Sequence, residues 1–235
     1  MILIGLDDTD MPGTPGTNQL ARAIVRELAP QFQLVWIVRH QLLDDPRVPY
    51  TSKNGSASIT LQPRDSSGGV SVVVDVCRRV MHGWFVPGSD PGLCVAPADR
   101  VSPAVTDWGH RCQQELVTRA AAQELAAAEE LHLEGLGGTH GGMIGALAAV
   151  GLAREANDGR IIQWQEWPDD LCGVHPVATI RQRGIGVRDA KSGADCHAGA
   201  VDVGKHLRPN LRCGAALLFV ERSEADQPMQ ALKFV

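Results

Sequence analysis

Apolar and polar positions recur with two different periods along the chain, and these periods predict strands that alternate with helices. Short apolar or alternating runs predict strands at 2–6, 32–40, 57–63, 93–97 and 160–164. Apolar residues at helical spacing predict helices at about 18–29, 70–85, 103–131 and 143–155. Strands alternating with helices indicate an α/β or α+β domain built in layers.

Three details of this pattern leave room for alternatives. Thr17 or Asn18 can cap the helix at 18–29. The β-branched residues of 70–85 also fit a strand, although their spacing favours a helix. The Ala-, Glu- and Leu-rich stretch 103–131 fits one long helix or two helices separated by a bend.

The pattern changes after residue 168. Residues 173–222 contain strand-like runs such as PVATI and AALLFVE, many glycines and no helical period. We therefore expect a layered sheet-and-helix domain over 1–168 and a small β-rich C-terminal unit over 169–235. The polar tail after Ser223 is expected to be frayed or loosely docked.

Composition agrees with a globular protein outside the membrane. Hydrophobic residues make up 44% and charged residues 21% of 235 residues, enough for one large domain or two small ones. No apolar run approaches the length of a membrane span. The first apolar run is short, lacks a basic flank and meets acids at once, unlike a signal peptide. We expect a cytoplasmic protein with no membrane partner.

The net charge of −5 argues against a domain that binds nucleic acid unaided, because such domains carry a basic excess. Basic residues do gather in the C-terminal third, where they form either a local patch or a solvated face. They are Arg181, Arg183, Arg188, Lys191, Lys205, Arg208 and Arg212.

Six cysteines are scattered without a C-x-x-C pair, which argues against a zinc ribbon and against a disulfide scaffold. Buried free thiols are the simpler interpretation. Cys172 with His175 and Cys196 with His197 are candidate ligand pairs, but neither has a clear second pair.

Three carboxylates crowd the end of the first predicted strand. In the segment LDDTD, Asp7, Asp8 and Asp10 fall within four residues. Ligands of open α/β sheets sit beyond strand ends, and Mg²⁺ takes one or two carboxylates together with water and phosphate oxygens. The segment therefore predicts a magnesium site that carries a nucleotide. In the alternative, one aspartate caps a turn and the others are solvated.

Two further segments contain groups that suit phosphate or substrate. The glycine-rich turn at 135–142 precedes a helix, so its backbone N–H groups could face an anion, or the turn could simply join packed elements. The segment PYTSKNGSAS at 49–58 places Thr51, Lys53 and Asn54 before a strand, although an Asn-Gly turn is sufficient to explain it.

Together, the three segments resemble the archaeal tRNA-isoleucine agmatinylcytidine synthetases. The likeness is carried by IGLDDTDMPGTPGTNQLA, VPYTSKNGSASITL and GGMIGALAAVG, in the same order and spacing, and covers roughly residues 1–165. It implies a kinase-like domain that binds ATP and Mg²⁺. In that family a tRNA cytidine is activated by phosphorylation before agmatine displaces the phosphate.

Carried over residue by residue, the resemblance assigns roles within this chain. Asp7, Asp8 and Asp10 would be metal ligands or lie just behind them. The residues placed near the phosphates or lining the site would be Gly141, Gly142, Thr51 and Asn54. The family also has an OB-type domain and a cysteine zinc ribbon, and this shorter chain has no C-x-x-C. The ATP-binding part therefore transfers better than the tRNA substrate.

We therefore expect an Mg²⁺- and ATP-dependent phosphotransferase or ligase-type enzyme. Its acceptor would be a small molecule or a nucleic-acid base, with RNA reached through a partner. Asp8 or His140 would act as the general base. An aspartyl-phosphate hydrolase built on Asp8-Thr-Asp10 is a weaker alternative, because Pro12 stands where Thr or Val is expected. A non-catalytic nucleotide- or metabolite-binding module of the same fold is the competing class.

Overall fold

The computed structural model describes residues 1–48, 54–65, 68–165, 167–224 and 227–233. The described helices are α1 (Thr17–Leu28), α2 (Val70–Gly83), α3 (Pro103–Gln114), α4 (Arg119–Ala128), α5 (Met143–Glu155) and α6 (Val177–Arg181). The longer strands are β1 (Ile2–Asp7), β2 (Phe32–Gln41), β3 (Gly55–Pro63), β4 (Gly92–Pro97), β6 (Arg160–Trp164) and β11 (Ala215–Glu221). The shorter strands are β5 (His132–Gly135), β7 (Val174–Pro176), β8 (Gly186–Asp189), β9 (Ala200–Asp202), β10 (Asn210–Arg212) and β12 (Met229–Ala231).

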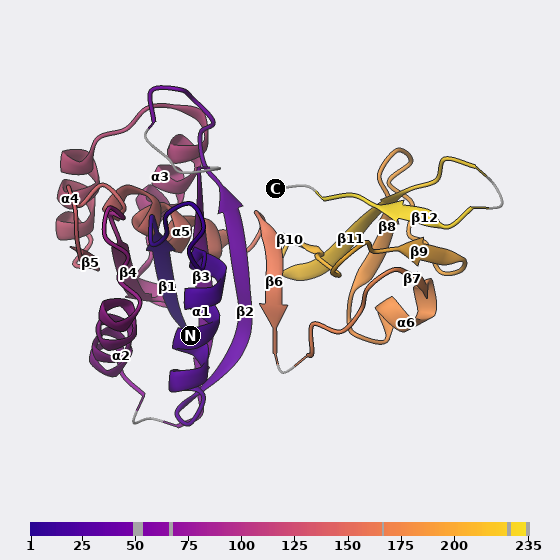
Figure 1. The fold of residues 1–235 in the computed structure, drawn as a ribbon, viewed down its shortest axis with the longest axis horizontal. Helices are drawn as coiled ribbons and strands as arrows, with labels where there is room; N and C mark the ends of the chain where they lie inside the picture. Colours follow the sequence, from indigo (N-terminus) through magenta and orange to yellow (C-terminus); the bar gives the residue numbers. More distant parts are fainter. Residues whose placement is uncertain (49–53, 66–67, 166, 225–226, 234–235) are drawn as a thin grey trace.

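One continuous sheet runs through the molecule in the order β5-β4-β1-β3-β2-β6-β10-β11-β12-β9-β7, with β8 paired to β11 (Figure 1). From β5 to β10 each described pair is antiparallel. The predicted metal site assumed the strand ends of an open α/β sheet, in which strands are mostly parallel. Because β1 runs against its neighbours here, the end of β1 meets the beginnings of β3 and β4.

Helices cover both faces of the first half of this sheet (Figure 1). α1 and α2 enclose one hydrophobic cluster with the apolar side chains of β1, β2 and β3. α3, α4 and α5 enclose a second cluster on the other face. α5 approaches the sheet so closely that a β-carbon on Gly5 of β1 would collide with the carbonyl of Ala146. The predicted layered α/β (α+β) architecture is confirmed.

The second half of the sheet has a hydrophobic cluster of its own, formed mainly by residues 171–229. It joins the first half through β6 and β10, where Asn210 pairs with Arg160 and where Val38, Ile161 and Leu211 pack together. A β-rich C-terminal part is therefore present. Because the sheet continues across the junction, the boundary at residue 168 stays a prediction.

Most elements lie where the pattern placed them, including α2, α5 and β6. The stretch 103–131 forms two helices, because residues 115–118 leave helical geometry between α3 and α4. The N-cap of α1 is Gly16, so the prediction of Thr17 or Asn18 is wrong by one or two positions. Strand β5 was not predicted, because its four half-buried residues carry too short a pattern.

The structure corrects one prediction for the C-terminal part and decides between the alternatives of another. The run PVATI predicts a strand, but Val177–Arg181 forms the short helix α6 after β7. The tail after Ser223 was expected to be frayed or loosely docked, and the structure shows it docked, because β12 pairs with β11 and with β9. Its Met229 is buried in the hydrophobic cluster, which explains why this segment is ordered against the sheet.

The cysteines divide by location. Cys77, Cys94 and Cys112 are buried free thiols, as predicted, whereas Cys172 and Cys213 are exposed and Cys196 is half-buried. Cys172 and His175 were a candidate ligand pair. In the structure Nε2 of His175 forms a hydrogen bond with the backbone carbonyl oxygen of Cys172 at 2.8 Å, instead of standing beside its sulfur as a second ligand. Among the described residues no helix is long and apolar enough to cross a membrane.

Candidate functional site

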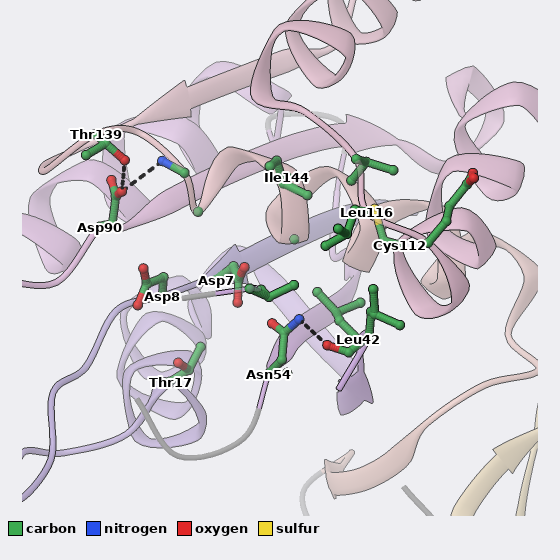
Figure 2. Close-up of a pocket in the computed structure, with 18 of the residues that line it drawn as sticks. Asp7, Asp8, Thr17, Leu42, Asn54, Asp90, Cys112, Leu116, Thr139 and Ile144 are labelled. Carbon is green, nitrogen blue, oxygen red and sulfur yellow. Dashed lines mark hydrogen bonds between the residues drawn. The ribbon is translucent and has the colours of Figure 1, made fainter. Parts of the chain in front are cut away.

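A pocket of about 190 Å³ opens where β1 ends, beside the beginnings of β3, β4, α1 and α5. Figure 2 shows Asp7, Asp8 and Asp90 at one end of the pocket and Leu42, Cys112 and Leu116 toward the other, and Glu115 also lines the pocket. We call Asp7, Asp8, Asp10 and Asp90 the acidic wall. We call Leu42, Leu43, Val48, Leu116, Val117 and Ile144 the apolar wall.

Asp7 is the last residue of β1 and lies opposite Gly92 of β4. Its carboxylate occupies the space over Gly145 of α5, where a β-carbon would collide with Oδ2. Burial, followed by the neighbouring charges of Asp8, Asp10 and Asp90, raises the pKa of Asp7 to about 7. The fold thus holds this carboxylate where a negative charge is unfavourable unless a cation accompanies it.

Asp8 begins the turn after β1 in a left-handed conformation, with φ of 49°. Its carbonyl accepts a hydrogen bond from the backbone N–H of Asp90 at 3.1 Å, which ties the turn to the segment before β4. Burial, then the charges of Asp90 and Asp10, raises the pKa of Asp8 to about 6. The left-handed turn therefore brings a second carboxylate into the same corner.

Asp10 is held by the beginning of α1. The Thr17 hydroxyl donates to Oδ1 of Asp10 at 3.2 Å and in turn accepts from the buried Thr9 hydroxyl at 3.0 Å. The Thr-rich helix start thus orients the third predicted acid instead of capping the helix.

The fourth acid, Asp90, was missed by the sequence reasoning. Its Oδ2 accepts from the Thr139 hydroxyl at 2.5 Å and from the N–H of Gly141 at 2.9 Å (Figure 2). Burial acts to raise the pKa of Asp90, but these hydrogen bonds outweigh it, so the pKa is lowered overall. The segment Ser89-Asp90-Pro91-Gly92 resembles an ordinary turn, and only the pairing of β4 with β1 reveals its role.

Asp90 also changes the expected role of the glycine-rich turn. Gly141 and Gly142 line the pocket, but Gly141 donates to the Asp90 side chain and Gly142 donates to its carbonyl at 3.2 Å. These two N–H groups are therefore engaged within the chain. Their contact with a phosphate stays a prediction that would require them to exchange partners.

The acidic wall fits a hard cation by two observations. Oδ1 of Asp90 is buried with no hydrogen-bond partner among the described residues, and the half-buried Asp7 stands among three other acids. No three His, Cys, Asp or Glu side chains in the described part of the chain already stand in metal-binding geometry. Mg²⁺ itself takes one or two protein carboxylates and completes its shell with substrate and water.

The other predicted site residues are placed differently. Asn54 lines the pocket, and its Nδ2 donates to the carbonyl of Leu43 at 2.8 Å, which holds the end of β2 against β3. His140 is exposed, does not line the pocket, and packs its β-carbon near Gly135. Thr51 lies outside the described residues. The structure thus brings together Asp7, Asp8, Asp10, Asn54, Gly141 and Gly142.

Cys112 lies at the apolar end, where a thiol could be mistaken for a nucleophile. Burial, followed by the charge of Asp7, raises the pKa of Cys112 to about 12. It is therefore a neutral thiol at physiological pH and a poor nucleophile. The carboxylates, rather than this thiol, are therefore the candidate reactive groups of the pocket.

Comparison with solved structures finds other proteins of this fold. Apo TiaS, a tRNA(Ile2) agmatidine synthetase, matches 64% of this chain at 21% identity and a TM-score of 0.55. The chain shares the TiaS fold. The TiaS–tRNA(Ile2)–ATP complex matches 64% of this chain at 22% sequence identity and a TM-score of 0.52. The TiaS–tRNA(Ile2)–AMPCPP–agmatine complex matches 63% of this chain at 21% sequence identity and a TM-score of 0.54.

The likeness to TiaS covers only part of those structures. This chain corresponds to 35% of apo TiaS, 36% of the ATP complex and 35% of the AMPCPP–agmatine complex. No protein-family model and no curated protein matches the sequence. The match to TiaS at this identity establishes the fold that the sequence motifs had predicted.

Proposed function

We propose that the chain is an Mg²⁺- and ATP-dependent phosphotransferase or ligase-type enzyme whose phosphate chemistry takes place at the acidic wall. The observation that carries the proposal is the convergence of Asp7, Asp8, Asp10 and Asp90 on one pocket, with Asp7 half-buried at the end of β1. Solved structures of the TiaS fold contain ATP or AMPCPP together with tRNA, which supports a nucleotide as the ligand.

Each part of the pocket has a place in this proposal. One or two of Asp7, Asp8 and Asp10 would hold the metal directly, and the remaining acids, with Asp90, would complete the negative surface around it. When bound there, Mg²⁺ would neutralise phosphate charge, which is the main requirement of phosphoryl transfer. The apolar wall would exclude water and receive an acceptor, either a small molecule or a nucleic-acid base.

The size of the pocket limits what it would enclose. Its volume of about 190 Å³ is below the roughly 300–1,000 Å³ of pockets that surround a whole ligand. It would therefore enclose the reacting phosphates and one end of the acceptor, while the rest of the nucleotide extends beyond it. Asp8, on the turn between Asp7 and Asp10, is the better placed of the two predicted general bases, since His140 does not line the pocket.

The first test is nucleotide binding by calorimetry with and without Mg²⁺. Asp8→Asn and Asp10→Asn should each weaken Mg²⁺-dependent ATP binding at least about tenfold, because each removes a charge that the cation would neutralise. Asp99→Asn is the matched control, since Asp99 is exposed and outside the pocket. Unchanged binding in Asp8→Asn and Asp10→Asn would make the acidic wall a purely structural feature.

A second assay separates the enzyme from a non-catalytic nucleotide- or metabolite-binding module. The chain is incubated with Mg²⁺-ATP and with candidate amines, nucleosides and RNA, and ADP, AMP and pyrophosphate are measured. An enzyme releases one of these products in an acceptor-dependent way that Asp8→Asn abolishes. Tight binding with no turnover for any acceptor would favour the module.

A further inference from the structure

Two arginines stand directly opposite each other where the two halves of the sheet meet. Arg39 of β2 is the cross-strand partner of Arg160 of β6, so their side chains lie on the same face. Like charges in this position destabilise a sheet. Burial, followed by Arg160, lowers the pKa of Arg39, although a guanidinium remains charged in proteins. The sheet therefore contains two half-buried positive charges that repel each other.

The described residues do not compensate this pair. Arg39 makes only long contacts of 3.4 Å to Oε1 of Gln41, and no described carboxylate forms an ion pair with either arginine. Nε of Arg160 is buried without a hydrogen-bond partner among the described residues. An unsatisfied buried donor is unfavourable in the folded chain, so a ligand that accepts from it would gain affinity there.

Two more arginines extend the positive charge along the same junction. Arg208 lies near enough to Arg160 to lower its pKa, after the larger effect of burial. Arg208 and Arg22 share a single carboxylate, that of Asp169, at 2.7 and 3.2 Å. We call Arg22, Arg39, Arg160 and Arg208 the arginine row. The row has one ion-paired carboxylate among the described residues, which leaves a local positive excess in an acidic protein.

Both ends of the arginine row lead to surfaces that suit a nucleic-acid strand. At one end the Arg39 guanidinium covers Gly55, a residue of the pocket, so closely that a β-carbon there would lie 2.5 Å from Nη2. At the other end Trp167 is 37% exposed and stacks on Arg183 with 5.4 Å between guanidinium carbon and ring centroid. Trp167 and Arg208 line the same small depression, together with Arg183 and with Asp169 and Asp170, the carboxylates that pair with Arg208 and Arg183.

We propose that the arginine row binds the phosphodiester backbone of an RNA strand and that Trp167 provides a surface on which a base stacks. Arg39 and Arg160 lie on neighbouring strands about 4.8 Å apart, Arg208 lies just before the next strand and Arg22 on α1, so several charges gather at the junction and suit a polyanion better than one phosphate. Planar guanidinium groups match phosphate oxygens, and positive grooves with aromatic side chains are a common way to bind single strands. The net charge of −5 is no obstacle, because the attraction is local.

The choice of RNA rests on the proposed function, because an acceptor base must reach the pocket from a strand held nearby. Figure 1 shows β6 and β10 between the helical half and the C-terminal part, where the row lies. A strand bound there would pass from the C-terminal part across β6 toward the pocket edge at Gly55. This arrangement gives the C-terminal part a role in positioning RNA.

The test measures binding of a fluorescent single-stranded RNA of about ten nucleotides by anisotropy, without ATP or Mg²⁺. Arg39→Gln and Arg160→Gln should each weaken binding about tenfold and reduce the salt slope by about 0.7 per lost phosphate contact. Trp167→Ala should weaken binding about fivefold or more with no change in salt slope. Arg188→Gln is the control. Arg188 lies on β8, outside the arginine row, where it pairs with Asp195, and its substitution removes the same charge.

Stability supplies an independent measurement. Without ligand, Arg160→Gln should raise the melting temperature by about 1–3 °C, because it removes a repulsion that a purely structural arginine would not have. RNA binding that is unchanged in Arg39→Gln and Arg160→Gln, or absent in the parent, would overturn the proposal. Competition by inorganic phosphate alone, with no affinity for RNA, would also overturn it in favour of a single-phosphate site.

ATP binding is measured in parallel on the same proteins. RNA binding without ATP binding would overturn the proposed function and leave the arginine row supported. ATP binding without RNA binding would overturn the role of the arginine row and leave the proposed function supported.

Discussion

Asp7 shows how strongly one position can depend on its neighbours. A carboxylate at the end of a strand is ordinary, yet burial against α5 raises its pKa to about 7. The space for it exists because residue 145 is glycine. The small residue on α5 and the acid on β1 therefore form one unit, although 138 positions separate them in the sequence.

This coupling predicts the effect of Gly145→Ala. The added methyl group would collide with Oδ2 of Asp7 and lie 2.9 Å from Leu42, so the carboxylate must move. We expect loss of Mg²⁺-dependent ATP binding in calorimetry and a loss of about 1–3 kcal/mol in the free energy of unfolding.

Gly83→Ala is the matched control for this change. Gly83 also lies in a helix, and a β-carbon added there would meet no atom within 4 Å, so stability should stay equal or rise slightly. Normal ATP binding by Gly145→Ala would show that the position of Asp7 is unimportant for the ligand.

Other residue contacts could not be anticipated from spacing. His40 is fully buried between Asp158, 2.7 Å from Nδ1, and Ser58, 2.8 Å from Nε2. The order resembles a catalytic triad, but none of the three residues lines the pocket, so the contact joins β2 and β3 to the turn before β6. Asp90 was missed for the same reason, since its partners are 49 and 51 positions away.

At the level of elements, the position of α5 decides the shape of the pocket. The helix is buried along nearly its whole length. Many of its residues are glycine or alanine, and these small side chains let it approach both β1 and α3 closely. Trp108 of α3 is 2% exposed and donates from Nε1 to the carbonyl of Ile144 at 3.2 Å. Since Ile144 belongs to the apolar wall, α3 holds the beginning of α5 in place.

Trp108→Ala should therefore be among the most damaging substitutions. Removing a buried tryptophan leaves a cavity, and we expect a loss of about 3–5 kcal/mol in the free energy of unfolding, measured with urea. Trp167→Ala, at an exposed position, should lose less than about 1 kcal/mol. Equal losses in the two variants would contradict the packing role assigned to α3.

At the level of the whole molecule, the two halves share a sheet and a salt-bridge network. Asp169 accepts from Arg22 on α1 and from Arg208 just before β10, so it connects the helical half to the C-terminal part. The hydrogen bond from Arg208, with a smaller contribution from Arg22, lowers the pKa of Asp169 from 3.8 to about 2.

This shift predicts a pH dependence of stability. The folded protein binds fewer protons at Asp169 than the unfolded chain, so the stabilisation is present above about pH 4 and is lost as the pH falls toward 2. Asp169→Asn should cost about 1 kcal/mol at pH 7, a value reduced because the side chain is 26% exposed.

Urea denaturation at pH 7 and pH 3 measures this difference. The loss in Asp169→Asn should be smaller at pH 3, where protonation has begun to weaken the same bridge in the parent. Asp195→Asn, at an exposed ion pair, should change stability by less than about 0.5 kcal/mol at either pH. A larger loss in Asp169→Asn at pH 3 than at pH 7 would contradict the assigned sign.

The sequence by itself determined the order of strands and helices up to α5 and β6, apart from the short strand β5, and three members of the acidic wall. These follow from local periodicity and from acids adjacent along the chain, which need no knowledge of distant contacts. Only the tertiary structure decided the antiparallel order of the sheet, the arrival of Asp90, the arginine pair across β2 and β6, and the short helix α6. Each depends on which distant segments are paired or packed together, and pairing depends on burial and register over the whole sheet rather than on any short window of residues.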